Sequence, residues 1–80
     1  MEMHERIRDY IESNGLKLNF VAEKAGINPK RFYRLINGSA PLVVKEYEII
    51  CTGLTVEPGY FFKEYFLESK NIDFPTKEVV

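Results

Sequence analysis

Residues 16–38 read LKLNFVAEKAGINPKRFYRLING, and this stretch predicts two short helices joined by a tight turn. The first helix, residues 18–25, ends at Gly26, because glycine adopts the left-handed conformation of a sharp turn at little cost. The second starts with Asn28 as N-cap and Pro29 in the first turn, where a missing N–H is harmless. It closes at Asn37-Gly38. The apolar positions predict one shared inward face: Val21, Ala22, Ala25, Phe32, Leu35 and Ile36.

Positive charge gathers on the same stretch. The 80-residue chain has a net charge of −1, but residues 1–38 hold seven Lys and Arg against five Asp and Glu. From Lys17 to Arg34, five basic residues stand against one acidic residue, Glu23. A helix pair with a basic second helix is typical of a helix-turn-helix, whose second helix enters the major groove of DNA. An ordinary solvated helix face is the alternative interpretation.

Three further helices are predicted outside this stretch, at residues 5–14, 43–52 and 57–69, with Gly53 as a candidate C-cap of the second of them. We therefore expect a compact all-α domain of five helices over residues 1–68. Residues 69–80 form a short C-terminal tail, either flexible or involved in dimerisation. The inward residues expected from helical spacing are Ile7, Tyr10, Ile11, Val43 or Val44, Tyr47, Ile50 and Leu54.

The composition is that of one small globular domain. Apolar residues make up 45% of the chain and aromatic residues 14%, which favours a packed core over disorder. The single cysteine, Cys51, cannot form an internal disulfide and is expected to be a small buried hydrophobe. No apolar run reaches the roughly 20 residues of a membrane span, and the N-terminus lacks a signal-peptide core. We expect a cytoplasmic protein without a membrane partner.

No pattern in the chain favours catalysis. The sequence lacks a Ser/His/Asp set, a Cys/His metal spacing and a Gly-rich phosphate loop. His4 has no ligand partners nearby in the sequence and is expected at the surface. We expect no enzyme activity, no metal and no cofactor.

The order and spacing of the motif residues resemble the lambda-repressor-like (Cro/C1-type, XRE) helix-turn-helix family. The resemblance covers about residues 5–66 and implies a sequence-specific DNA-binding transcriptional regulator. This would be a Cro- or repressor-like protein of phage or mobile-element type, acting as a homodimer on operator DNA. The positions that carry it are Leu16, Val21, Ala22, Ala25, Gly26, Ile27, Phe32, Leu35, Asn37 and Gly38, with the segment 52–62 downstream.

The resemblance also implies which residues contact double-stranded DNA. Lys30 and Arg34 lie four apart on one helix face and suit the O6 and N7 acceptors of guanine in the major groove. Arg31 points to one side and is expected at a phosphate. Tyr33 either stacks on the DNA backbone or lies against the preceding helix. The complete expected set is Lys17, Asn28, Pro29, Lys30, Arg31, Tyr33, Arg34, Asn37 and Ser39.

Aromatic residues crowd the last predicted helix. One interpretation is that these residues are mostly core. The other is that some remain exposed, because five on one short helix exceed what a small core absorbs, and an exposed apolar patch usually marks an interface. The candidate dimer interface is Tyr60, Phe61, Phe62, Tyr65, Phe66 and Phe74.

A second hypothesis gives the same fold a different partner. Leu18 stands where the family usually has Gln, and Pro29 replaces a frequent base-contacting residue. Together with the net charge of −1 and the aromatic C-terminal half, these residues favour a protein-interaction module. Such a module would bind a partner regulatory protein, with weak or no DNA binding.

Overall fold

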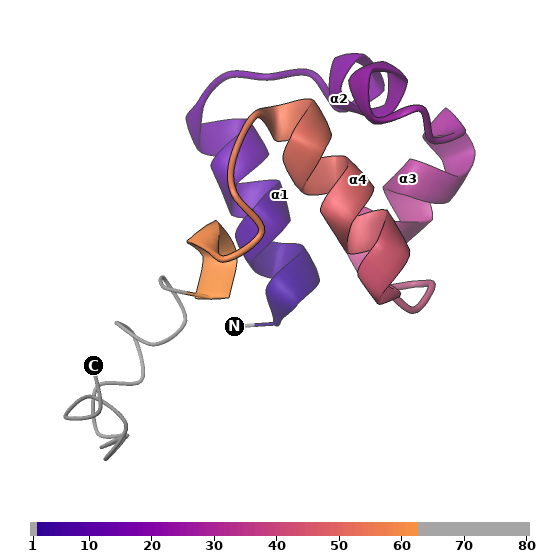
Figure 1. Ribbon diagram of the computed structural model, residues 1–80. Helices are drawn as coiled ribbons and strands as arrows, with labels where there is room; N and C mark the ends of the chain where they lie inside the picture. The colour runs from indigo at the N-terminus through magenta and orange to yellow at the C-terminus, as the bar shows by residue number, and fades with distance from the viewer. Residues whose placement is uncertain (1, 63–80) are drawn as a thin grey trace, which may run out of the picture.

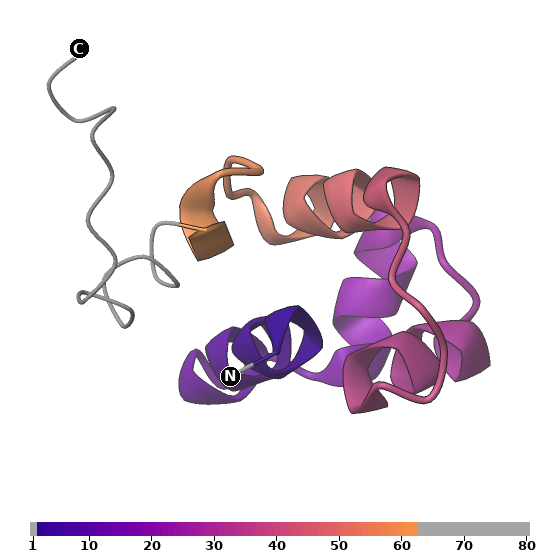
Figure 2. The ribbon, with the colours of Figure 1, turned by 90° about the horizontal axis from the view of Figure 1, so that it is seen from below.

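The computed structural model describes residues 2–62, which are all-helical and contain no strand. Four α-helices lie around a common centre: α1 (Met3–Ser13), α2 (Leu18–Ala25), α3 (Pro29–Asn37) and α4 (Val44–Leu54) (Figure 1, Figure 2). A further helical turn begins at Tyr60 and lies on the opposite side of the body from α3 in both views. The all-α prediction is confirmed over this range. The rest of the predicted fifth helix, the boundary at residue 68 and the tail lie outside the described residues.

α1 begins two residues earlier than predicted because Glu2 and Glu5 cap it reciprocally. The backbone N–H of Glu2 donates to Glu5 Oε1 at 2.7 Å, and the Glu2 carboxylate accepts from the backbone of Glu5. This capping box satisfies N–H groups that the first turn leaves without helical partners.

The turn between α2 and α3 has the predicted caps. Gly26 ends α2 in the left-handed region, at φ 73°, and Ile27 packs half-buried against the core. The Asn28 side chain accepts from the backbone N–H groups of Lys30 at 2.9 Å and Arg31 at 3.3 Å. Gly38 closes α3 at φ 81°. Capping at both ends fixes where α3 begins and how its first turn is presented.

The end of α4 differs from the prediction. Gly53 is not the cap; it lies inside the helix, and Thr55 takes the left-handed conformation at φ 62°. A Cβ on Gly53 would lie 3.1 Å from the Ala25 backbone nitrogen. Glycine therefore serves close packing of α4 on α2 at this position rather than a turn.

The core contains every apolar residue predicted on α2 and α3, together with Ile7, Ile11, Tyr47, Ile50 and Leu54. Tyr10 is half-buried. The expectation that Val43 or Val44 points inward is wrong, because the two residues occupy the N-cap and first turn of α4, where they stay exposed. Arg6 is buried, which the apolar pattern did not anticipate. Cys51 is fully buried as predicted, and burial raises the pKa of its thiol.

Of the three aromatic residues at positions 60–62, one is buried in the core and two are exposed. Phe61 is 1% exposed and packs edge-on against Tyr10 and Tyr47, with ring centroids 5.6 and 6.4 Å apart. Its assignment to a dimer interface is therefore wrong, since it belongs to the core of this domain. Tyr60 and Phe62 remain exposed at 37% and 48%. Tyr65, Phe66 and Phe74 lie outside the described residues.

Candidate nucleic-acid interface

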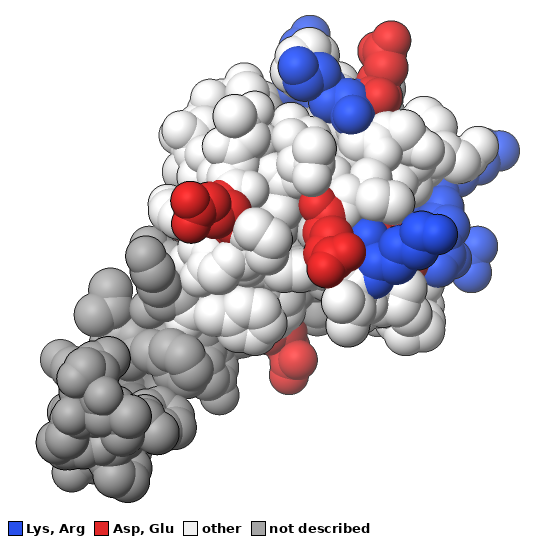
Figure 3. Space-filling model, in the orientation of Figure 1, with Lys and Arg blue, Asp and Glu red and all other residues white. Residues whose placement is uncertain are grey.

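All of the predicted DNA-contacting residues are exposed side chains of α3, its flanking turns or the start of α2. Figure 3 shows Lys and Arg atoms gathered over α2 and along the side formed by α3. Asp and Glu atoms are spread singly over the same view. The uneven charge expected from the sequence is thus present as a basic side of the molecule.

A shallow recess lies on this basic side. It has a volume of about 460 Å³ and is lined by Pro29, Lys30, Tyr33 and Arg34 of α3 and by Asn19 of α2. Its apolar floor comes from side chains at helical spacing, which therefore share a face. Tyr33 is 51% exposed and lines the recess, so it lies beside α2 without being buried there. The recess brings together four of the residues predicted from the sequence. We call it the α3 recess.

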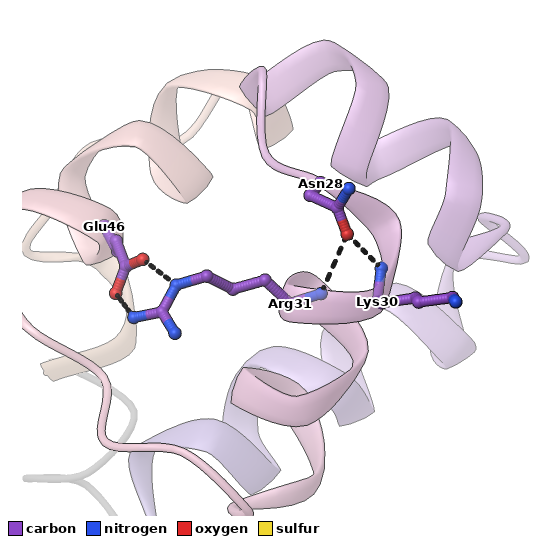
Figure 4. A network of polar contacts seen from close by, with 4 residues as sticks. All are labelled: Asn28, Lys30, Arg31 and Glu46. Atoms are coloured by element: carbon purple, nitrogen blue, oxygen red, sulfur yellow. Dashed lines mark hydrogen bonds and ion pairs between the residues drawn. The ribbon is translucent and has the colours of Figure 1, made fainter.

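Arg31 points away from this recess. Its guanidinium donates to both carboxylate oxygens of Glu46, from Nε at 2.6 Å and from Nη2 at 3.0 Å (Figure 4). Lys30 extends in the opposite direction. The hydrogen bond and charge of Arg31 lower the pKa of the Glu46 carboxyl, and Glu46 in turn raises the pKa of Arg31. The sequence predicts that Arg31 contacts a DNA phosphate, whereas in the structure Arg31 binds the carboxylate of Glu46 on α4.

Two other predicted residues also have protein partners or neighbours. The Asn37 amide oxygen accepts from Arg8 Nη1 at 2.5 Å, which ties the end of α3 to α1. Ser39 lines a groove on another part of the surface, next to His4. Lys17 is the N-cap of α2, and its ammonium group, which can only donate, makes no cap bond to the N–H groups there.

Three residues of this region are not predicted from the sequence. Asn19 lines the α3 recess, whereas Leu18, which stands where the family usually has Gln, packs half-buried against the core. Glu46 holds Arg31, although 15 positions separate them in the sequence. Phe20 is exposed, with Lys24 Nζ 5.8 Å from its ring centroid. Of these contacts, only the one between Phe20 and Lys24 could have been predicted, because an aromatic residue and a lysine four residues apart share a helix face.

A second, larger groove lies between the N-terminus of α1, the loop after α3 and the start of α4. Its volume is about 810 Å³. Apolar side chains dominate its lining, among them Met3, Leu42, Val44 and Phe62, and His4 lies there against Gly38. His4 is thus half-buried rather than a plain surface residue.

Comparison of the chain with protein-family models, curated proteins and solved structures gives no match. Within residues 2–62, no helix combines the length and apolar character needed to cross a membrane. Over the same residues, His, Cys, Asp and Glu side chains form no cluster of three that could hold a metal ion.

Proposed function

We propose that this protein is a sequence-specific DNA-binding transcriptional regulator of the lambda-repressor-like kind, which inserts α3 into the major groove. The observation that supports this proposal best is the α3 recess. Lys30 and Arg34 flank it on the exposed face of a helix whose N-terminus is capped by Asn28. A rigid helix that presents two cations four residues apart matches the size and chemistry of the major groove.

Five residues of this side have a role in the proposal. Arg34 pairs bidentately with guanine O6 and N7, and Lys30 donates to the same kind of acceptor on a neighbouring base. Asn19 and Tyr33 border the same recess and contact the adjoining sugar and phosphate. Lys17, at the N-terminus of α2, meets a phosphate, because this end of a helix also presents N–H groups to an anion.

A homodimer on a pseudo-palindromic operator completes the proposal. Two recognition helices one DNA turn apart strengthen a weak single contact. Exposed Tyr60 and Phe62 are the described part of the candidate pairing surface, and neither of them lines the α3 recess. Occupying the operator would block polymerase or a competing regulator, with no cofactor required.

Selection of bound duplexes from a random DNA pool tests the proposal. Wild type is compared with a Lys30→Ala/Arg34→Ala variant and with Lys24→Ala, which removes a cation of α2 outside the α3 recess. We expect wild type and Lys24→Ala to enrich the same guanine-containing motif and the double variant to enrich none. Absence of any enriched motif with folded wild-type protein would contradict sequence-specific binding.

The large groove favours a second candidate function, a protein-interaction module that binds a partner regulator. Val44 is 73% exposed and lines this groove with Phe62. Exposed apolar surface of this kind marks protein interfaces. In this case α3 would contribute little to binding, and substitutions in the α3 recess would leave partner binding unchanged.

A further inference from the structure

The Arg31–Glu46 ion pair joins the proposed DNA-reading helix to the next helix. Arg31 sits in the first turn of α3 and Glu46 in the first turn of α4. The two side chains meet edge to edge, with both carboxylate oxygens on the Nε–Nη2 side of the guanidinium (Figure 4). This is the bidentate geometry in which arginine also binds a phosphate.

Glu46 is the better anchored partner of the two. Its side chain is 18% exposed, and it lies where the positive end of the α4 dipole favours a carboxylate. The Arg31 side chain is 46% exposed and reaches across from α3. Arg31 is therefore the group that a DNA phosphate could draw away, while Glu46 stays in place.

We infer that Glu46 is a specificity-determining residue, because it competes with a DNA phosphate for Arg31 and so limits sequence-independent binding. The inference rests on the proposed function. A phosphate contact adds affinity for every sequence alike, whereas contacts to base edges distinguish sequences. With Arg31 held by Glu46, Lys30 and Arg34 at the recess account for a larger share of the binding energy.

The charge balance supports the same conclusion. The chain is net negative, so each cation on the α3 side matters for non-specific attraction to DNA. Pairing with Glu46 neutralises Arg31 locally. Breaking the pair to bind a phosphate would also leave the Glu46 carboxylate close to the negatively charged backbone, which penalises non-specific complexes.

Glu46→Gln tests this inference, because glutamine keeps the size and hydrogen-bonding capacity of the side chain but removes its charge. The matched control is Glu48→Gln, which removes one negative charge from the same helix without facing Arg31. Equilibrium binding of the full chain is measured on a random-sequence duplex and on the duplex selected above, over a range of salt concentrations. Arg31→Gln and the Arg31→Gln/Glu46→Gln double variant complete a cycle that isolates the pair.

We expect Glu46→Gln to bind the random duplex more tightly than Glu48→Gln does. The slope of log affinity against log salt should steepen by about 0.9, equivalent to a further loss of about 3-fold between 50 and 200 mM salt. The ratio of specific to random binding should fall. In the Arg31→Gln background, Glu46→Gln should behave like Glu48→Gln.

Two results would overturn the inference. One is equal behaviour of Glu46→Gln and Glu48→Gln on the random duplex, and the other is an effect of Glu46→Gln that persists without Arg31. If wild type binds DNA and either result appears, this inference alone fails. If folded wild type binds no duplex even at low salt, the proposed function fails first and the inference with it.

Discussion

Gly53 of α4 and Ala25 of α2 approach so closely that a Cβ on Gly53 would lie 3.1 Å from the backbone nitrogen of Ala25 and 3.2 Å from its Cα. The missing side chain lets α4 pack on the last turn of α2, directly before the turn into α3. The position of the proposed recognition helix on the rest of the body thus depends on a glycine inside a helix.

Overpacking in a tight contact costs about 1–3 kcal/mol, and alanine normally gains about 1 kcal/mol over glycine in helix propensity. Because the atoms that the new Cβ would meet belong to the backbone of Ala25, Gly53→Ala should destabilise the protein by up to about 2 kcal/mol net. The free energy of unfolding is measured by chemical denaturation. Gly59→Ala is the control, because a Cβ there meets nothing within 4 Å. A Gly53→Ala variant as stable as wild type would show that α4 is not held against α2 in this way.

Asn28→Ala should lower the free energy of unfolding by about 1 kcal/mol, the usual effect of losing an N-cap. The side chain accepts from two N–H groups at the start of α3, and alanine leaves both without a protein partner. Asn28→Asp keeps an acceptor and should stay close to wild type. Thermal or chemical unfolding of the three proteins checks this, and equal loss in both variants would mean that the side-chain acceptor is not the source of the stabilisation.

The Glu46 carboxyl predicts a pH dependence of stability. Its pKa in the folded protein is below the ordinary value of 4.5, mainly because Arg31 donates hydrogen bonds to it. A lowered pKa stabilises the folded state at pH values above 4.5, and this contribution disappears as the pH falls through the folded-state pKa. Wild type should therefore exceed Glu46→Gln in stability at neutral pH, and the difference should shrink below about pH 4.5. A difference that is constant from pH 7 to pH 3 would contradict this assignment.

The fold of residues 16–38 could be predicted from the sequence because its signals are local. Gly26, Asn28 and Gly38 act on the backbone within a few residues of themselves, and the apolar spacing of α2 and α3 identifies their inner faces. The end of α4 could not be predicted in the same way. Whether Gly53 caps a helix or allows a close approach depends on Ala25, which is distant in the sequence.

In the candidate site, too, local features could be predicted from the sequence and contacts between helices could not. The exposure of Lys30, Tyr33 and Arg34 follows from the helical period alone. The partners of Arg31 and Asn37 do not, because Glu46 and Arg8 come from other helices. The burial of Phe61 could not be predicted either, because periodicity does not distinguish an aromatic ring that fills the core from neighbouring rings that remain exposed.

Arg34→Ala and Lys17→Ala should separate reading of bases from binding of phosphates. Arg34→Ala should lose discrimination at one base pair, by about 1–3 kcal/mol, because Arg34 is assigned a guanine contact. Lys17→Ala should weaken binding to all sequences about equally and reduce the salt slope by about 1. Binding to the selected duplex and to single-site variants of it checks both. Identical behaviour of the two variants would show that the assigned roles are wrong.

The most direct test of DNA binding through α3 is the affinity of the wild-type chain for duplex DNA as a function of salt concentration. Several phosphate contacts release counterions, so affinity should fall steeply and linearly on a log–log plot as salt rises. The Lys30→Ala/Arg34→Ala variant should bind the selected duplex more weakly than wild type does. If folded wild-type protein shows no binding even at low salt, or binds as tightly without Lys30 and Arg34, α3 does not recognise DNA.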